Sequence, residues 1–149
     1  PTHKESTRNP IQSLVVHSSL EGMTYERSEH ISKQMRNIYH ATKTDNKTYL
    51  TVTQGLNEIT VIAETRVAQS FRNKLKGGKK IYDKKHLIGI TVKFDLGYLE
   101  IPNLIFALTR RLSYKNINII EIVSTATELT YILTKQDLSQ ALEQLQKEI

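Results

Sequence analysis

Apolar and polar residues alternate in the C-terminal part of the chain and then follow a helical repeat. The segments Ile117–Val123 and Thr127–Leu133 are rich in Ile, Val, Thr and Tyr, which is typical of strands in a covered sheet. From Leu138 onward the apolar positions recur at helical spacing, so this segment is predicted to be an amphipathic helix. Thr134, with Asp137 three residues later, predicts a capping box at its start.

The same pattern occurs 70 residues earlier, where Thr48–Leu75 aligns without a gap with the segment just described. We interpret this match as an internal duplication of two units. The coinciding positions are Glu58 with Glu128, Thr60 with Thr130, Ile62 with Ile132, Leu75 with Leu145, and, upstream, Ile31, Met35 and Ile38 with Ile101, Ile105 and Leu108.

The rest of the chain supplies the other elements of both units. The predicted elements are strands at Ile11–Ser18 and Met23–Arg27 around a turn at Leu20–Gly22, a helix at Glu29–Ala41 capped by Ser28, strands at Tyr49–Thr53 and Ile59–Ala63, a helix at Thr65–Lys76, a strand at His86–Phe94, and a helix that starts near Pro102, ends near Tyr114 and has the apolar stripe Ile101, Leu104, Ile105, Leu108 and Leu112. Each half then has the order β-α-β-β-α, and the strand at 86–94 can close the first unit and open the second.

The predicted fold is therefore α+β, with two tandem ferredoxin-like βαββαβ units whose antiparallel sheets carry helices on one face. We expect a tail or linker stump at residues 1–10, a first unit at 11–83 and a second unit at 84–149.

Composition restricts the class of protein. The chain has 149 residues, with 38% hydrophobic and 24% charged, as in soluble globular proteins. No apolar run approaches the ~20 residues that cross a bilayer, and no signal-peptide pattern opens the chain. The chain has no cysteine, which excludes disulfides and thiolate chemistry and fits a reducing compartment. We therefore expect a cytoplasmic protein with no membrane partner.

The net charge of +6 is concentrated in one connection that contains six lysines. These are Lys74, Lys76, Lys79, Lys80, Lys84 and Lys85. A basic loop of this kind can bind phosphates or nucleic acid. The commoner explanation is a solvated, mobile loop around Gly77 and Gly78.

Motifs of catalysis are missing from the sequence. There is no HExxH spacing, no GxxxxGK loop and no GxSxG elbow, and the five histidines are scattered. We expect no catalytic residue, no metal site and no cofactor, and hence no enzyme in this chain alone.

The run from Ile101 to Leu145 resembles an ACT domain, and its closest counterpart is the tandem pair at the C-terminus of aspartokinases. Three stretches carry the resemblance: Ile101-Pro102-Asn103 for the Pro-Gly that opens the first helix, Asn116–Ile119 for the "GIN-I" step into the second strand, and Val123–Glu128 for the Ser/Thr-rich turn. Asn103 stands where the family usually has Gly, and the first copy has Ser32-Lys33 at the matching place. The resemblance implies a non-catalytic regulatory module, which binds a small ligand such as an amino acid, mediates dimerisation, or does both. An amino-acid kinase domain, upstream or separate, would then be its partner.

Candidate ligand-binding residues follow from the chemistry of an amino acid. Its carboxylate suits free N–H groups at a helix start, which Asn103 and Leu104 can supply, and its ammonium suits the carboxylate of Asp95. The amide of Asn118 can bind both ends. The resemblance adds Ile119 in the "GIN-I" step and Gln54, Asn57, Ser124 and Thr125 at strand turns that line the partner edge in the family. A purely structural role as turn formers and strand-start hydrogen bonders remains the alternative for these residues.

Two other functions stay open. The first is a basic ferredoxin-like nucleic-acid-binding module, although only Tyr49 and Tyr131 lie at strand centres and no aromatic-rich RNA-binding motif is present. The second is a degenerate unit that only holds subunits together. Because the predicted edge strands contain no proline and carry apolar residues on both faces, we expect a symmetric homodimer.

Overall fold

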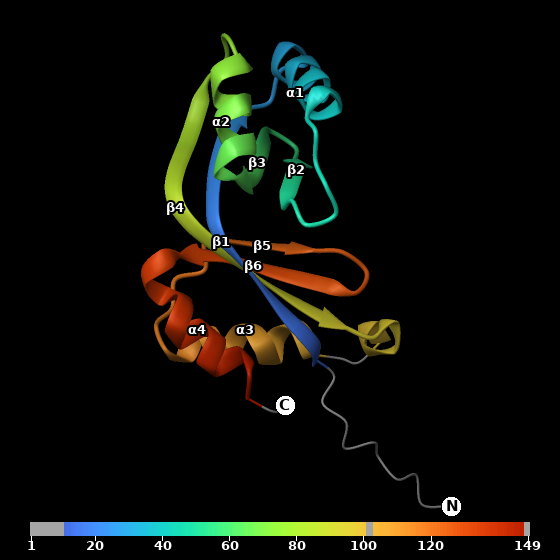
Figure 1. The fold of residues 1–149 in the computed structure, drawn as a ribbon, viewed down its shortest axis with the longest axis vertical. Helices are drawn as coiled ribbons and strands as arrows, with labels where there is room; N and C mark the ends of the chain where they lie inside the picture. Colours follow the sequence, from blue (N-terminus) through green and yellow to red (C-terminus); the bar gives the residue numbers. More distant parts are fainter. Residues whose placement is uncertain (1–10, 101–102, 148–149) are drawn as a thin grey trace, which may run out of the picture. The chain divides into compact units, whose positions relative to one another are not determined.

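Two long strands, β1 (Ile11–Glu26) and β4 (Lys80–Phe94), dominate the architecture (Figure 1). The computed structural model describes residues 11–100 and 103–147, so the predicted tail at 1–10, Ile101 and Pro102 lie outside the described residues. The remaining elements are α1 (Glu29–Ala41), β2 (Leu50–Gln54), β3 (Glu58–Glu64), α2 (Thr65–Lys74), η1 (Leu96–Glu100), α3 (Leu104–Tyr114), β5 (Glu121–Ser124), β6 (Glu128–Thr134), η2 (Lys135–Asp137) and α4 (Leu138–Leu145). No helix in the described part of the chain is both long and apolar enough to cross a membrane.

The chain folds into two compact units. The central unit is His17–Ile88, and the flanking unit combines Pro1–Val16 with Gly89–Ile149. The strand order is β2-β3-β1-β4 in the central unit and β1-β4-β6-β5 in the flanking unit, which is the order of a ferredoxin-like βαββαβ fold in each. The predicted fold class is confirmed. The fourth strand of the flanking unit is the first part of β1, from the start of the chain. The units expected from the sequence, 11–83 and 84–149, did not include this contribution.

The two hairpins repeat at the predicted interval. Val52 lies opposite Val61 in the β2–β3 pair, and Ile122 lies opposite Tyr131 in the β5–β6 pair. The turns match as well. Gly55 N–H donates to Glu58 O at 2.8 Å, and Thr125 N–H donates to Glu128 O at 2.9 Å.

The two helices follow the predicted match only in part. Ile38 of α1 and its predicted counterpart Leu108 of α3 are both buried. The predicted match of Ile105 with Met35 fails, because Met35 is buried whereas Ile105 is 48% exposed and does not belong to the buried stripe. Ile101, the predicted counterpart of Ile31, lies outside the described residues.

Several element boundaries differ from the prediction. The predicted turn at Leu20–Gly22 is wrong: β1 is continuous there and pairs with β3, and Gly22 lies opposite Ile62. The strand predicted from His86 begins at Lys80, and His86 adopts the left-handed region at φ 59°. The strand predicted from Ile117 begins only at Glu121.

Two helix ends also differ. The last helix starts at Leu138 after η2, and Thr134 makes no side-chain cap to the backbone. Its hydroxyl instead donates to the Asp137 carboxylate at 3.4 Å, so the capping box is wrong. Helix α2 ends at Lys74, two residues earlier than predicted, and its cap residue Leu75 donates its N–H to Phe71 O at 2.9 Å.

Each unit buries one face of its sheet under two helices (Figure 1). The core of the central unit comes from α1, α2 and the helix-facing sides of β1 and β3: Met23, Tyr25, Ile31, Met35, Ile38, Ile59, Val61, Ala63, Val67, Ala68, Phe71 and Leu75. In the flanking unit the buried apolar residues of the helices are Leu104, Leu108 and Leu112 of α3 and Ala141 and Leu145 of α4. This burial is the main stabilisation of both units.

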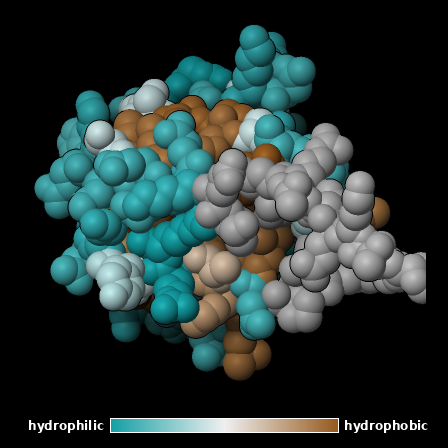
Figure 2. Space-filling view, turned by 90° about the horizontal axis from the view of Figure 1, so that it is seen from below, coloured by the Kyte–Doolittle hydropathy of each residue, from teal (hydrophilic) through white to brown (hydrophobic). Residues whose placement is uncertain are grey.

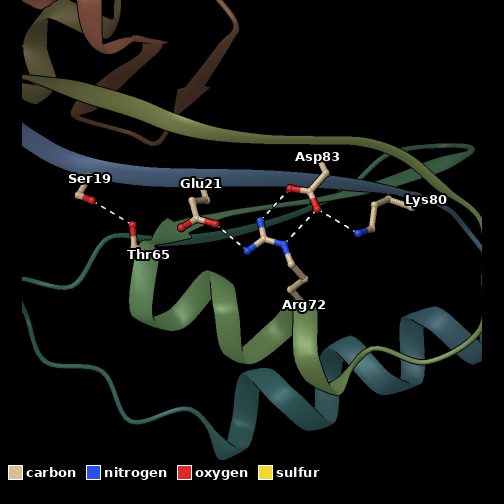
Figure 3. Close-up of polar contacts among 6 residues, drawn as sticks. All are labelled: Ser19, Glu21, Thr65, Arg72, Lys80 and Asp83. Carbon is tan, nitrogen blue, oxygen red and sulfur yellow. Dashed lines mark hydrogen bonds and ion pairs between the residues drawn. The ribbon is translucent and has the colours of Figure 1, made fainter.

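Arg72 of α2 joins three elements of the central unit (Figure 3). Its guanidinium donates to Glu21 Oε1 of β1 at 2.6 Å and to the Asp83 carboxylate of β4 at 2.7 and 3.0 Å. Lys80 also donates to Asp83, at 3.0 Å. These charge-assisted bonds tie α2 to both long strands.

The lysine-rich connection is anchored rather than free. Gln34 of α1 accepts from Lys76 N–H at 2.9 Å and donates to Lys76 O at 2.8 Å. Gly78, at φ 87°, lies against Ile31, where an added Cβ would come within 2.5 Å of Ile31 Cδ1. Of the six lysines, Lys74 belongs to α2, and Lys80, Lys84 and Lys85 belong to β4. Lys76, Gly77, Gly78 and Lys79 are all exposed to solvent, as expected of a solvated loop.

Candidate functional site

One end of the flanking unit gathers most of the predicted ligand-binding residues. Phe94 N–H donates to Thr127 O at 3.0 Å, so the end of β4 lies beside the β5–β6 turn. Asp95 follows β4 directly, and Ser124 and Thr125 begin that turn. The carboxylate of Asp95 accepts a hydrogen bond from the Gln12 side-chain amide, and its carbonyl accepts from Tyr98 N–H at 2.9 Å. These residues therefore lie at the same end of the strands in the flanking unit.

Asn103 precedes α3 at this end in a left-handed conformation, with φ 70° and ψ 9°. Its carbonyl accepts from Ala107 N–H at 2.8 Å, and its side chain makes no capping bond. Gly and Asn adopt this conformation at the lowest cost, so Asn103 keeps the backbone geometry that a Gly would give. The first N–H groups of α3 have no partner within the helix and carry the positive end of its dipole.

Asn118 and Ile119 lie at the opposite end of the flanking unit. Ile120 N–H donates to Ile132 O at 2.8 Å, near the C-terminal end of β6, so the residues before Ile120 lie beyond that end. Four residues, 120–123, lie between Ile119 and Ser124, and the extended chain spans roughly 16 Å over these five steps at about 3.3 Å per residue. One flanking unit therefore does not bring Asn118 together with Asp95 and Asn103.

Gln54 and Asn57 occupy the β2–β3 turn of the central unit, beside Arg27. Asn57 O accepts from Arg27 N–H at 2.8 Å, and the Arg27 guanidinium donates to Gly55 O at 3.2 Å and Leu56 O at 3.5 Å. A hollow of about 550 Å³ opens here, lined by Arg27, Ser28, Glu29, Ser32, Arg36, Gln54 and Leu56.

A second hollow, of about 280 Å³, adjoins the first along α1 and β2. Its lining residues are Ser32, Met35, Arg36, Tyr39, His40, Leu50, Val52, Gln54 and Ile59. Of these lining residues, the sequence predicted Gln54 as ligand-binding but not Ser32 or Arg36. Ser32 and Arg36 are four residues apart and so lie on one face of α1, which the sequence could have indicated. The sequence does not indicate that this face lies beside the edge strand β2.

Exposed apolar residues follow the start of α3. Ile105 is 48% exposed and Phe106 is 62% exposed, and Leu96 of η1 is exposed as well. Figure 2 looks from the side on which α3 and α4 lie in Figure 1, and it shows hydrophobic surface in brown among hydrophilic residues. Apolar side chains on an outward helix face are typical of a surface that contacts another protein.

Two ionisable side chains of the flanking unit have altered pKa values. Burial raises the pKa of Tyr131 to about 12, against the effect of its 2.8 Å hydrogen bond with Thr109. Burial also raises the pKa of the Glu121 carboxyl on β5. The Tyr131 side chain is fully buried, which leaves it no access to a substrate. Within residues 11–100 and 103–147, His, Asp and Glu form no group of three or more that could hold a metal ion.

Comparison with known proteins identifies the fold. No family model matches the chain, and no curated protein matches its sequence. The ligand-free regulatory subunit of aspartate kinase from Thermus thermophilus superposes with a TM-score of 0.73 at 11% identity, over 91% of this chain and 96% of that subunit.

Full-length enzymes contain the same fold as one part of a longer chain. Aspartate kinase from Clostridium acetobutylicum matches with a TM-score of 0.72 at 11% identity, over 97% of this chain and 36% of the enzyme. E. coli aspartokinase III in complex with lysine and aspartate matches with a TM-score of 0.67 at 12% identity, over 95% of this chain and 34% of the enzyme. The chain has the fold of an aspartate kinase regulatory region and spans about a third of these enzymes' length.

Proposed function

We propose that the chain is a non-catalytic regulatory module that binds an amino acid and assembles as a homodimer. One observation supports this proposal most strongly. The match covers 91% of this chain and 96% of the regulatory subunit of aspartate kinase, so nearly the whole of that subunit has the same fold as this chain. A kinase domain, in the same polypeptide or a separate one, is the partner whose activity the module would control.

The arrangement of the candidate residues supports a ligand held between neighbouring copies. The α3 start offers N–H groups and a helix dipole to a carboxylate, and Asp95 lies at the same end for an ammonium. Asn118 lies at the other end, so a ligand that contacts it together with Asp95 needs a second unit alongside. A homodimer supplies such a unit.

Nucleic-acid binding is the second candidate, favoured by the net charge of +6. The described residues give nucleic-acid binding little support. Tyr131 is buried under α3, where its hydroxyl pairs with Thr109, so it cannot stack on a base. Lys80 pairs with Asp83, and Lys76 is held through its backbone by Gln34. Nucleic acid that bound tightly with a steep salt dependence would favour this second function.

Thermal unfolding in the presence of each of the twenty amino acids tests the proposal, because a ligand that binds only the native state raises the melting temperature. We expect one amino acid, or a few related ones, to raise it. Asp95→Ala and Asn118→Ala should each abolish the shift and leave the unliganded melting temperature nearly unchanged.

Asp45→Ala is the matched control, since Asp45 belongs to the α1–β2 loop of the central unit and not to the flanking unit. It should keep the full ligand response. A protein that no amino acid stabilises contradicts the proposal. Normal responses in both Asp95→Ala and Asn118→Ala contradict the site.

A further inference from the structure

The outward face of α3 presents a stripe of aromatic and basic side chains. Phe106, Arg110 and Tyr114 follow one another at intervals of four residues, so they lie on the same side of the helix. Phe106 is 62% exposed, Tyr114 is 80% exposed, and Arg110 is exposed as well. At 1.5 Å per residue the stripe extends over about 12 Å of the helix axis. Two aromatic rings are thus open to solvent with a guanidinium between them.

A hollow of about 410 Å³ lies beside this stripe, between α3 and α4. Its lining residues are Ala107, Arg110, Arg111 and Tyr114 of α3 and Gln144 of α4, and the two helices contact each other. All of these residues belong to the flanking unit. A groove between two neighbouring helices, with aromatic side chains along one wall, suits a third helix that places its own side chains between theirs. We call this surface the α3–α4 hollow.

One wall of the α3–α4 hollow is fixed by contacts at the end of α4. The Arg111 guanidinium donates to Lys147 O, and Lys147 Nζ donates to Gln144 Oε1 at 3.3 Å. Arg111 therefore has a structural role, because a cation stabilises the carbonyl end of a helix. Arg110 and Tyr114 differ from it: neither makes a side-chain hydrogen bond or ion pair with a residue that the structure describes. Their side chains are free to contact a partner.

The surface around the α3–α4 hollow is cationic. Arg110 and Arg111 line it, Lys115 follows α3 and Lys147 follows α4, whereas α3 itself contains no acidic residue. Glu143 of α4 is exposed but does not line the hollow. A second copy of the chain would bring the same positive charges against this face, and like charges across an interface are unfavourable. Charge complementarity therefore favours a partner that carries carboxylates.

We propose that the α3–α4 hollow is a docking surface for an acidic amphipathic helix of another protein. Carboxylates of that helix pair with Arg110 and Lys147, and its apolar side chains cover Ala107 and the rings of Phe106 and Tyr114. Aromatic and Arg side chains supply most of the binding energy in many protein interfaces. The inference goes beyond the proposed function, because the lining of the hollow includes none of the candidate amino-acid-binding residues and needs no second copy of the chain.

Fluorescence anisotropy with a labelled synthetic peptide tests the inference. The probe is a helical peptide of about 16 residues, with leucines at i, i+3, i+4 and i+7 and glutamates on both sides of that stripe. We expect the full chain to bind it saturably, with an affinity that falls as the salt concentration rises. A second peptide, in which glutamine replaces every glutamate, should bind at least tenfold more weakly.

Two variants at exposed positions locate the binding surface. Arg110→Glu should weaken binding of the acidic peptide at least tenfold by reversing the charge, and Phe106→Ser should weaken it by removing the apolar contact. Lys33→Glu is the matched control, because it reverses one exposed charge on α1 of the central unit and should bind the peptide as the wild type does. Asp95→Ala should also bind as the wild type does, so the peptide site and the amino-acid site are tested separately.

Several results would overturn the inference. These are no saturable binding of the acidic peptide, equal binding of the glutamate and glutamine peptides, and wild-type affinity in either Arg110→Glu or Phe106→Ser. Dissociation of a homodimer by Phe106→Ser overturns it as well, because a second copy would then cover this face. A protein that binds the acidic peptide through Arg110 and Phe106 but is stabilised by no amino acid upholds the inference and contradicts only the proposed function.

Discussion

Thr24 and Thr60 lie opposite each other on β1 and β3, with their hydroxyl oxygens 2.8 Å apart. The flanking unit repeats the arrangement, since the hydroxyl oxygens of Thr91 and Thr130 lie 2.7 Å apart on neighbouring strands β4 and β6. Each pair joins the first and third strands of its unit. The duplication therefore includes a polar pair inside the sheet as well as the apolar positions that indicated it in the sequence.

A double-mutant cycle measures the Thr24–Thr60 pair. We expect Thr24→Val and Thr60→Val each to lower the free energy of unfolding, because one hydroxyl loses its partner at a largely buried position. The double variant should recover part of the loss, with a coupling of about 0.5–1.5 kcal/mol in urea unfolding. Strict additivity of the two single changes would contradict a direct hydrogen bond.

The Arg72–Asp83 pair predicts a pH dependence of stability. The hydrogen bond from Arg72 is the main cause that lowers the pKa of the Asp83 carboxyl below its ordinary 3.8. A carboxyl whose folded pKa is lowered adds stability above its unfolded pKa, and this stability is lost as the pH falls through the folded pKa. Unfolding free energies of wild type and Asp83→Asn should therefore differ by a constant amount at neutral pH and converge below about pH 3.8. A difference that stays constant to low pH would show that the ion pair contributes nothing.

Gly78 is predicted to resist substitution. Gly78→Ala places a Cβ 2.5 Å from Ile31 Cδ1 and forces a φ of 87° on an L-residue. We expect a loss of about 1–3 kcal/mol in unfolding free energy. Gly97→Ala is the control, because no atom lies within 4 Å of its added Cβ. Equal stability of the two variants would contradict the anchored connection.

The sequence predicted the hairpins better than the elements around them. Alternation around the short turns at Gly55 and Thr125 determines register locally, so the 70-residue match carried over to the strand pairs. In α3 the neighbouring Leu104 and Ile105 both suit an apolar stripe, and only the packing shows which one is buried. The pairing of β1 with β3 joins residues that are distant in the chain, such as Leu20 and Glu64, and a local sequence pattern does not predict such pairs.

The candidate site was predictable in its parts rather than as a whole. The turn and helix-start chemistry indicated Asp95 and Asn103, which do share one end of the flanking unit. Asn118 was proposed because its amide can both donate and accept, but the strand that follows it places it at the other end of the flanking unit. The two hollows beside α1 in the central unit were not predictable, because they require α1 to lie along β2, and the spacing of Ser32 and Arg36 does not indicate that arrangement.

Assembly is predicted from the edge strands. β2 and β5 end the strand order, contain no proline, and expose Val52 and Ile122. Unpaired backbone groups beside apolar side chains favour pairing with a second copy. Light scattering over a range of protein concentrations should give a mass of twice 17.1 kDa. Val52→Lys and Ile122→Lys, made singly, should identify the pairing edge by shifting the mass toward the monomer. A mass that stays at 17.1 kDa at every concentration, with or without ligand, would exclude the dimer.

Ligand binding by the isolated chain is the central claim, and equilibrium dialysis with radiolabelled amino acids measures it most directly. The account predicts saturable binding of at least one amino acid, with a whole number of sites per dimer and no chemical change in the recovered ligand. Asp95→Ala should remove the saturable part, and Asp45→Ala should keep it. Equal label on both sides of the membrane for all twenty amino acids would contradict the account.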